Sequence, residues 1–205
     1  HFKAKFFFLK NIFFQSMPIT IAILGYSIAA TVVFTYVGLF GEYAVAGYGS
    51  ATRIEQVVLL PILGINTAII SIIAQNIGAK YYDRVEQSYF TSIKYGLFIM
   101  LIAGVVIFIS ADIVPKFFSS NPEVIMHGSM YLKISAFILP AYPIFFLSNG
   151  FFMALKKSEK AMVNNIARNV IVPVLSFYIA KYLNADFKTF FYIWAIFQWL
   201  ISLML

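Results

Sequence analysis

The chain has 205 residues, of which 61% are hydrophobic, 19% aromatic and 11% charged, and its formal net charge is +7. A soluble domain of this length has too little interior to bury so much apolar surface, so the composition excludes a soluble fold and predicts an all-α membrane protein. The basic residues lie in short loops between apolar runs, which argues against nucleic-acid binding, and without cysteine the chain has no disulfide or thiol chemistry.

Six apolar stretches approach or exceed the roughly 20 residues that a helix needs to cross the hydrocarbon core of a bilayer. In chain order they cover residues 15–40, 44–79, 88–113, 122–155, 161–183 and 187–205. We expect them to form one six-helix transmembrane bundle that takes up the whole chain. The residues before the first span, His1–Phe14, carry lysines among phenylalanines and are predicted to lie on the membrane surface as an amphipathic lead-in.

Prolines interrupt three of the predicted spans. Pro61 lies near Gly64 in the second span, Pro140 and Pro143 lie in the fourth, and Pro173 lies in the fifth. Proline removes a backbone donor and its ring clashes with the preceding turn, so we predict bends in the second and fourth spans. Such kinks face packed neighbours or water rather than lipid, because the released carbonyl needs another partner.

The loop charges differ between the two sides of the predicted bundle. One side carries Lys3, Lys5, Lys10, Lys80, Arg84, Lys156, Lys157 and Lys160. The other side mixes Lys116, Lys181 and Lys188 with the acidic residues Glu42, Asp112, Glu123 and Asp186. Because loops rich in lysine and arginine remain in the cytoplasm, we predict a multi-pass protein of the cytoplasmic membrane with both ends on the cytoplasmic side.

Four charged side chains stand out inside the spans, where a charge is costly and faces a cavity or a partner. They are Arg53, Glu55, Lys133 and Arg168. Arg53 and Glu55 point in nearly opposite directions around one helix, whereas Glu55 and Lys133 fall at similar depth and are predicted to pair. The long side chains of Arg53 and Lys133 can reach the interface or link helices. The short carboxylate of Glu55 cannot, which leaves open whether it couples ion binding or only links helices.

Amide side chains form a second polar group inside the second, fourth and fifth spans. Asn66 follows Glu55 by three helical turns, so the two lie on nearly one face. Amides either hydrogen-bond helices together or line a water-filled path for a polar or cationic substrate, and both interpretations remain open. The group consists of Asn66, Gln75, Asn76, Asn149, Asn164, Asn165 and Asn169.

Motifs of enzymes are missing from the sequence. There is no H-E-x-x-H zinc motif, no G-x-S-x-G nucleophile turn, no Walker A loop and no pair of aspartates for prenyl transfer. The two histidines, His1 and His127, are isolated, and His127 is expected to be an interfacial residue rather than a metal ligand. We therefore expect no enzyme activity and no bound cofactor or metal.

Three stretches resemble one family of transporters, the multidrug and toxic compound extrusion (MATE) family. Ala46–Glu55 is similar to the start of the second helix in that family's C-terminal lobe, and Ala74–Ala79 resembles the Q-N-x-G-A signature that ends the same helix. Asn149–Lys156 is similar to the N-G-x-x-x-A-L stretch that closes the fourth helix, and the basic, amide-rich residues 160–173 follow as in the family. The resemblance extends over nearly the whole chain.

The resemblance implies one lobe, the second, of a twelve-helix antiporter that exports organic cations or drugs in exchange for Na⁺ or H⁺ by alternating access. Its partners would be the bilayer, a small cationic substrate and an N-terminal lobe outside this chain. The chain does not begin with Met and stops inside an apolar run, as expected for part of a longer protein. The candidate transport and coupling residues are Glu55, Arg53, Asn66, Gln75, Asn76, Lys133, Asn149, Asn165 and Arg168.

The sequence departs from the family in its acidic residues. Some members carry cation-binding carboxylates in the first and fourth helices of this lobe, and here neither span has one in its membrane part. Coupling would then use Glu55 or the other lobe. Two alternatives stay open: a lipid-linked sugar flippase of a related family, and a non-transporting scaffold subunit. The buried carboxylate and the kinked spans argue against the scaffold, because a passive anchor needs neither.

Overall fold

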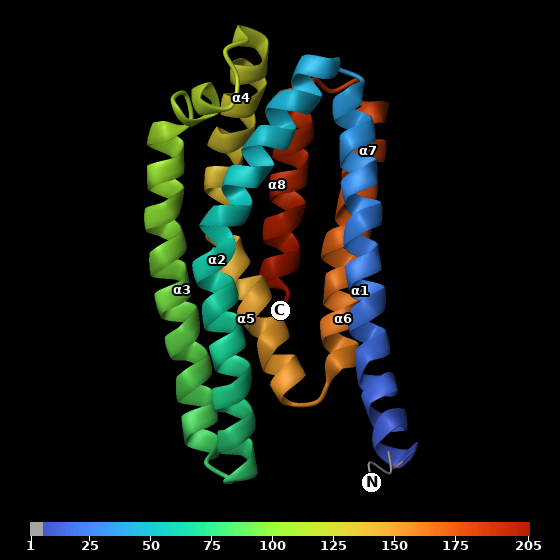
Figure 1. Ribbon diagram of the computed structural model, residues 1–205, viewed down its shortest axis with the longest axis vertical. Coiled ribbons are helices and arrows are strands. Elements are labelled where there is room, and N and C mark those ends of the chain that lie inside the picture. The colour runs from blue at the N-terminus through green and yellow to red at the C-terminus, as the bar shows by residue number, and fades with distance from the viewer. Residues whose placement is uncertain (1–5) are drawn as a thin grey trace, which may run out of the picture.

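The computed structural model describes residues 6–205, and that part of the chain is helical throughout apart from its turns (Figure 1). The predicted all-α membrane bundle is confirmed. Its elements are α1 (Phe6–Gly38), α2 (Glu42–Gly78), α3 (Tyr82–Ser110), the 3₁₀ helix η1 (Val114–Phe117), α4 (Pro122–Ile138), α5 (Ala141–Ala154), α6 (Ser158–Ile166), the π-helical turn η2 (Ala167–Ile171), α7 (Val172–Tyr182) and α8 (Phe187–Leu203).

These elements follow the six predicted spans in order, with differences at the ends. From Phe6 onward the predicted lead-in is not a separate segment, because α1 continues through it to Gly38, and its first five residues lie outside the described part. Three described helices, α2, α3 and the run Ser158–Tyr182, are long and apolar enough to cross a membrane, and the bent pair α4–α5 makes a fourth. Two shorter apolar helical runs remain, Leu24–Gly38 within α1 and Phe187–Leu203, which is α8.

The fourth span bends where its prolines predict. The axes of α4 and α5 meet at 54°. Pro140 has no N–H with which to form a helix hydrogen bond. Near the break, the Trp199 indole N–H donates to the Phe137 carbonyl oxygen at 2.8 Å. In contrast, α2 remains one helix across Pro61, although Figure 1 shows its course changing near the middle. The fifth span contains a π-helical turn, η2, directly before α7 and its second residue, Pro173.

The helices form two packed groups that meet along α8. Helix α2 packs on α3, α4 and α5, whereas α1 packs on α6, η2 and α7, and α8 contacts α4, α5 and α7. Aromatic rings fill the seam around α8: Tyr36 stacks on Phe190 with ring centroids 4.2 Å apart, and Tyr48 stacks on Phe191 at 5.3 Å. These rings bury large apolar area and thereby fix α1 and α2 against the centre of the bundle.

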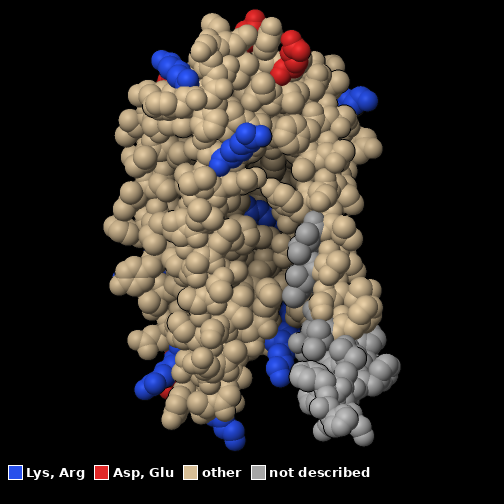
Figure 2. Space-filling view, viewed as in Figure 1, with Lys and Arg blue, Asp and Glu red and all other residues tan. Residues whose placement is uncertain are grey.

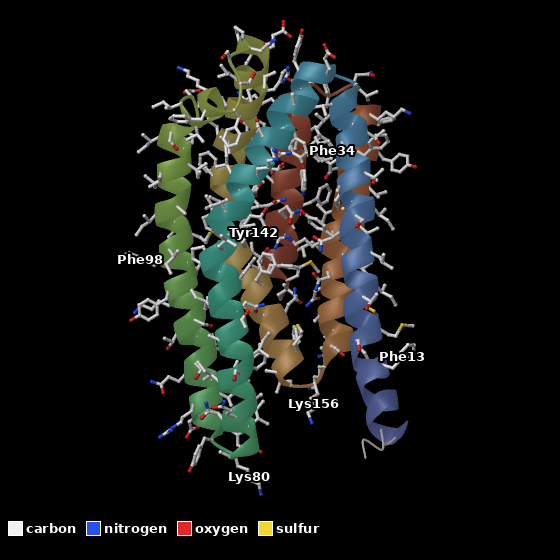
Figure 3. All side chains as sticks on the ribbon, viewed as in Figure 1. Phe13, Phe34, Lys80, Phe98, Tyr142 and Lys156 are labelled. Atoms are coloured by element: carbon white, nitrogen blue, oxygen red, sulfur yellow. The ribbon has the colours of Figure 1, made fainter. Side chains whose placement is uncertain are left out.

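Three helices end in the same tight turn. Lys80, Lys156 and Asn184 each have positive φ directly after the last helical turn. The next amide then reaches back to a helix carbonyl, as Tyr81 does to Asn76 at 2.9 Å, which closes a Schellman-type cap. Such short turns reverse the chain, so the Lys80 and Lys156 loops lie at one end of the bundle (Figure 3), as the alternation of six spans predicts. Figure 2 shows acidic side chains gathered at the opposite end.

Candidate functional site

The carboxylate of Glu55 lies buried between three helices, with only 7% of the residue exposed. Helix α2 positions Glu55, and each oxygen accepts a hydrogen bond from a tyrosine hydroxyl: one from Tyr131 of α4, the other from Tyr142 of α5 at 2.5 Å. The bend between α4 and α5 lies between these two tyrosines in the sequence. Two O–H donors aimed at one carboxylate compensate part of the cost of burying it.

Arg168 is the second buried charge and lies on the π-helical turn η2, 3% exposed. Its guanidinium carbon lies 4.4 Å from the ring centroid of Tyr142, 4.1 Å from that of Phe145 and 5.8 Å from that of Phe146. These three aromatic residues are spaced by three and four along α5, so they share the face that contacts Arg168. Tyr142 therefore joins the two buried charges: its hydroxyl bonds Glu55 and its ring contacts Arg168.

Amides extend the same seam between α5 and α6. Asn149 lies two turns after Tyr142, and its Oδ1 accepts from Asn164 Nδ2 at 3.2 Å. Asn164 in turn lies one helical turn before Arg168. Asn165 bonds within α6, donating to the Ala161 carbonyl at 2.7 Å. The predicted amide group is thus partly brought together, on α5 and α6.

Asn66 reaches the site from α2. A Cβ built on Gly150 would lie 2.1 Å from Asn66 Oδ1, so the side chain of Asn66 occupies the space that this glycine leaves beside α5. Within the described part of the chain, the buried Asn66 Oδ1 has no hydrogen-bond partner. Only a residue without a side chain at position 150 admits the amide so close to the helix.

Three predicted residues lie apart from this cluster. Gln75 and Asn76 bond within their own helix near its end, Gln75 to the Ser71 hydroxyl at 3.4 Å and Asn76 to the Ile72 carbonyl at 2.8 Å. Arg53 is exposed on α2. In the described part of the chain, none of these three side chains has a hydrogen bond or ion pair with Glu55 or Arg168.

The predicted pair between Glu55 and Lys133 is wrong. Lys133 Nζ instead lies 2.8 Å from Asp112 Oδ2, in the turn after α3, and the Ser129 hydroxyl also donates to Asp112. The hydrogen bond from Lys133, with that from Ser129, holds the pKa of the Asp112 carboxyl below its ordinary value. The reason is helical geometry: Tyr131 faces Glu55, so Lys133, two residues later, points to the other side of α4.

The buried cluster lies near mid-height of the bundle, where Figure 3 labels Tyr142 between α2 and α5. Figure 2 shows the face between α1 and α2 hollowed, with a basic side chain at the base of the hollow. Chemically, the cluster offers a carboxylate, a guanidinium, two phenol hydroxyls and several amides, which are groups able to bind ions and polar organic molecules. In residues 6–205, no group of three or more His, Cys, Asp or Glu side chains is placed to hold a metal ion.

Comparison with known proteins relates this geometry to a family. The sequence model of the MatE family matches residues 18–178. The chain is 26% identical over 150 residues to the probable multidrug resistance protein YpnP of Bacillus subtilis, covering 73% of this chain and 32% of that protein. It is 25% identical over 168 residues to the multidrug export protein MepA of Staphylococcus haemolyticus, covering 82% of this chain and 37% of that protein.

A solved structure described as the outward-facing conformation of a multidrug resistance MATE family transporter superposes on 99% of this chain and 46% of its own, with a TM-score of 0.92 and 24% identity. The chain therefore spans about a third of the curated relatives' length and about half of the solved transporter. A helical bundle with this coverage is one lobe of the larger fold. The chain belongs to the MatE family of multidrug and toxic compound extrusion transporters.

Proposed function

We propose that the full-length protein containing this lobe is a secondary active antiporter, which exports organic cations or drugs across the cell membrane in exchange for Na⁺ or H⁺. The observation that carries the proposal is the buried Glu55–Tyr142–Arg168 cluster at mid-depth in a lobe of this family. The relatives described above are named as multidrug proteins, which favours drug export over the flippase and over a scaffold subunit.

Glu55 is the residue to which we assign coupling. A buried carboxylate is stable only when it carries a proton or lies near a positive charge. Tyr131 and Tyr142 hold its two oxygens in place, and the guanidinium of Arg168 lies over the Tyr142 ring. Binding of an ion or a cationic substrate near Glu55 favours the charged carboxylate over the protonated one. If the two conformations of the protein differ in how well they hold that charge, ion binding is linked to the conformational change.

Export is tested in cells that lack their own drug pumps. Expression of the full-length gene is expected to speed the efflux of a fluorescent organic cation, and collapse of the H⁺ or Na⁺ gradient is expected to stop it. Separate collapse of each gradient identifies the coupling ion. Folded protein in the membrane with no gradient-dependent efflux of any cationic dye would contradict the proposal.

The proposed orientation is tested by cysteine labelling, because the chain has no native cysteine to add background. Glu42→Cys and Asn184→Cys, in the turns opposite the basic loops, are expected to react with an impermeant thiol reagent added outside intact cells. Lys80→Cys and Lys156→Cys are the matched controls and are expected to react only after the membrane is opened. The reverse pattern would place the termini outside the cytoplasm.

A further inference from the structure

Arg168 has hydrogen-bond donors that the protein itself does not use. Its two terminal nitrogens, Nη1 and Nη2, are buried and have no hydrogen-bond partner within the described residues. The guanidinium carbon lies over the rings of Tyr142 and Phe145, and a ring face does not supply the lone pair of an ordinary hydrogen-bond acceptor. A buried guanidinium with unused donors is costly unless an acceptor reaches it in some state of the protein.

The nearby carboxylate does not satisfy these donors. Both oxygens of Glu55 already accept from tyrosine hydroxyls, and the ion pair found in the described part of the chain joins Lys133 to Asp112, not Arg168 to Glu55. Asn149, on the same face of α5, adds a further buried donor without a partner, its Nδ2. The contact between α5 and the α6–η2 helix therefore contains buried N–H donors, from Arg168 and Asn149, that have no acceptor in the described structure.

We propose that Arg168 binds an oxyanion group, a carboxylate or a phosphate, of an aromatic substrate, with Asn149 as a second donor. The planar fork of a guanidinium matches such a group with two parallel hydrogen bonds, and the surrounding aromatic rings suit an aromatic ligand. A ligand would enter from the face between α1 and α2, which Figure 2 shows hollowed. The inference rests on the proposed transport function and narrows its substrate class to those aromatic drugs and organic cations that also carry an oxyanion.

Matched dyes test the proposal on the purified full-length protein. A rhodamine with a free carboxylate is compared with its ethyl ester, and an aryl phosphate with the corresponding phenol, by fluorescence polarisation. Arg168→Gln is expected to weaken binding of the carboxylate or the phosphate by about tenfold or more, since a charge-assisted bidentate pair is lost, and to leave the ester and phenol unchanged. The two acid probes distinguish a carboxylate site from a phosphate site.

Two further variants separate the role of the guanidinium shape from that of its charge and provide a control outside the site. Arg168→Lys retains the charge and loses the fork, so it is expected to restore only part of the binding. Arg84→Gln removes another arginine that lies over a tyrosine ring, 5.1 Å from the Tyr81 centroid and outside the site, and is expected to change nothing. Equal loss of the acid and neutral dyes in Arg168→Gln, or no loss of either, would overturn the proposal. If the wild type transports the ester dye but binds the acid and the ester equally well, only this inference fails. If the wild type transports neither dye, the proposed function itself fails.

Discussion

Glu55→Gln in the full-length protein is expected to leave expression and folding nearly intact and to reduce ion-coupled efflux by about tenfold or more. Glutamine keeps the shape of glutamate, and its amide can accept from one tyrosine hydroxyl and donate to the oxygen of the other, so Tyr131 and Tyr142 keep their partners. What is lost is the charge that an ion or a proton can compensate. Efflux of a fluorescent cation is measured over a range of pH and Na⁺ concentration.

The matched control is Glu42→Gln, which removes a carboxylate from the exposed first turn of the same helix. It is expected to transport like the wild type. Normal efflux with an unchanged pH profile in Glu55→Gln would show that Glu55 only holds α2 to α4 and α5. Coupling would then have to be sought outside this chain.

The fold was predictable because its signals are local. Long apolar runs predicted the order of the helices, and the prolines at positions 140 and 143 predicted the bend between α4 and α5. At the second predicted bend, Pro61 lies within one continuous helix whose course changes near its middle (Figure 1), because tertiary packing decides how far a helix opens around a missing donor.

The site was only partly predictable, because it depends on contacts between helices that lie far apart in the sequence. Glu55 and Arg168 were identified as costly charges, and both are buried. The tyrosines that bind the carboxylate were missed, since tyrosine in an apolar helix is usually taken for an interfacial residue. Depth alone suggested Lys133 as the partner, but depth does not fix which side of a helix a residue faces. One available signal was spacing: Tyr142, Phe145 and Asn149 share one face of α5.

Helix rotation also decides how closely α2 approaches α4. A Cβ built on Gly47 would lie 2.6 Å from the Val124 carbonyl oxygen and 2.9 Å from the Gly128 amide nitrogen, both backbone atoms of α4. Small residues let membrane helices pack at this distance, where van der Waals contact rather than the hydrophobic effect holds them together. Tyr131 follows Gly128 by three residues, so this contact also sets the position from which its hydroxyl reaches Glu55.

Gly47→Ala is therefore expected to destabilise the full-length protein by about 1–3 kcal/mol, the usual cost of overpacking, and to lower its thermal midpoint by several degrees. Gly64→Ala, in the same helix, is the matched control: a Cβ there meets nothing within 4 Å, and alanine favours a helix over glycine by about 0.5–1 kcal/mol. Thermal unfolding in detergent compares the two variants. Equal midpoints would mean that α2 and α4 do not meet at Gly47, and the geometry that brings Tyr131 to Glu55 would lose its basis, because at no other described glycine of α2 would a Cβ lie within 4 Å of α4.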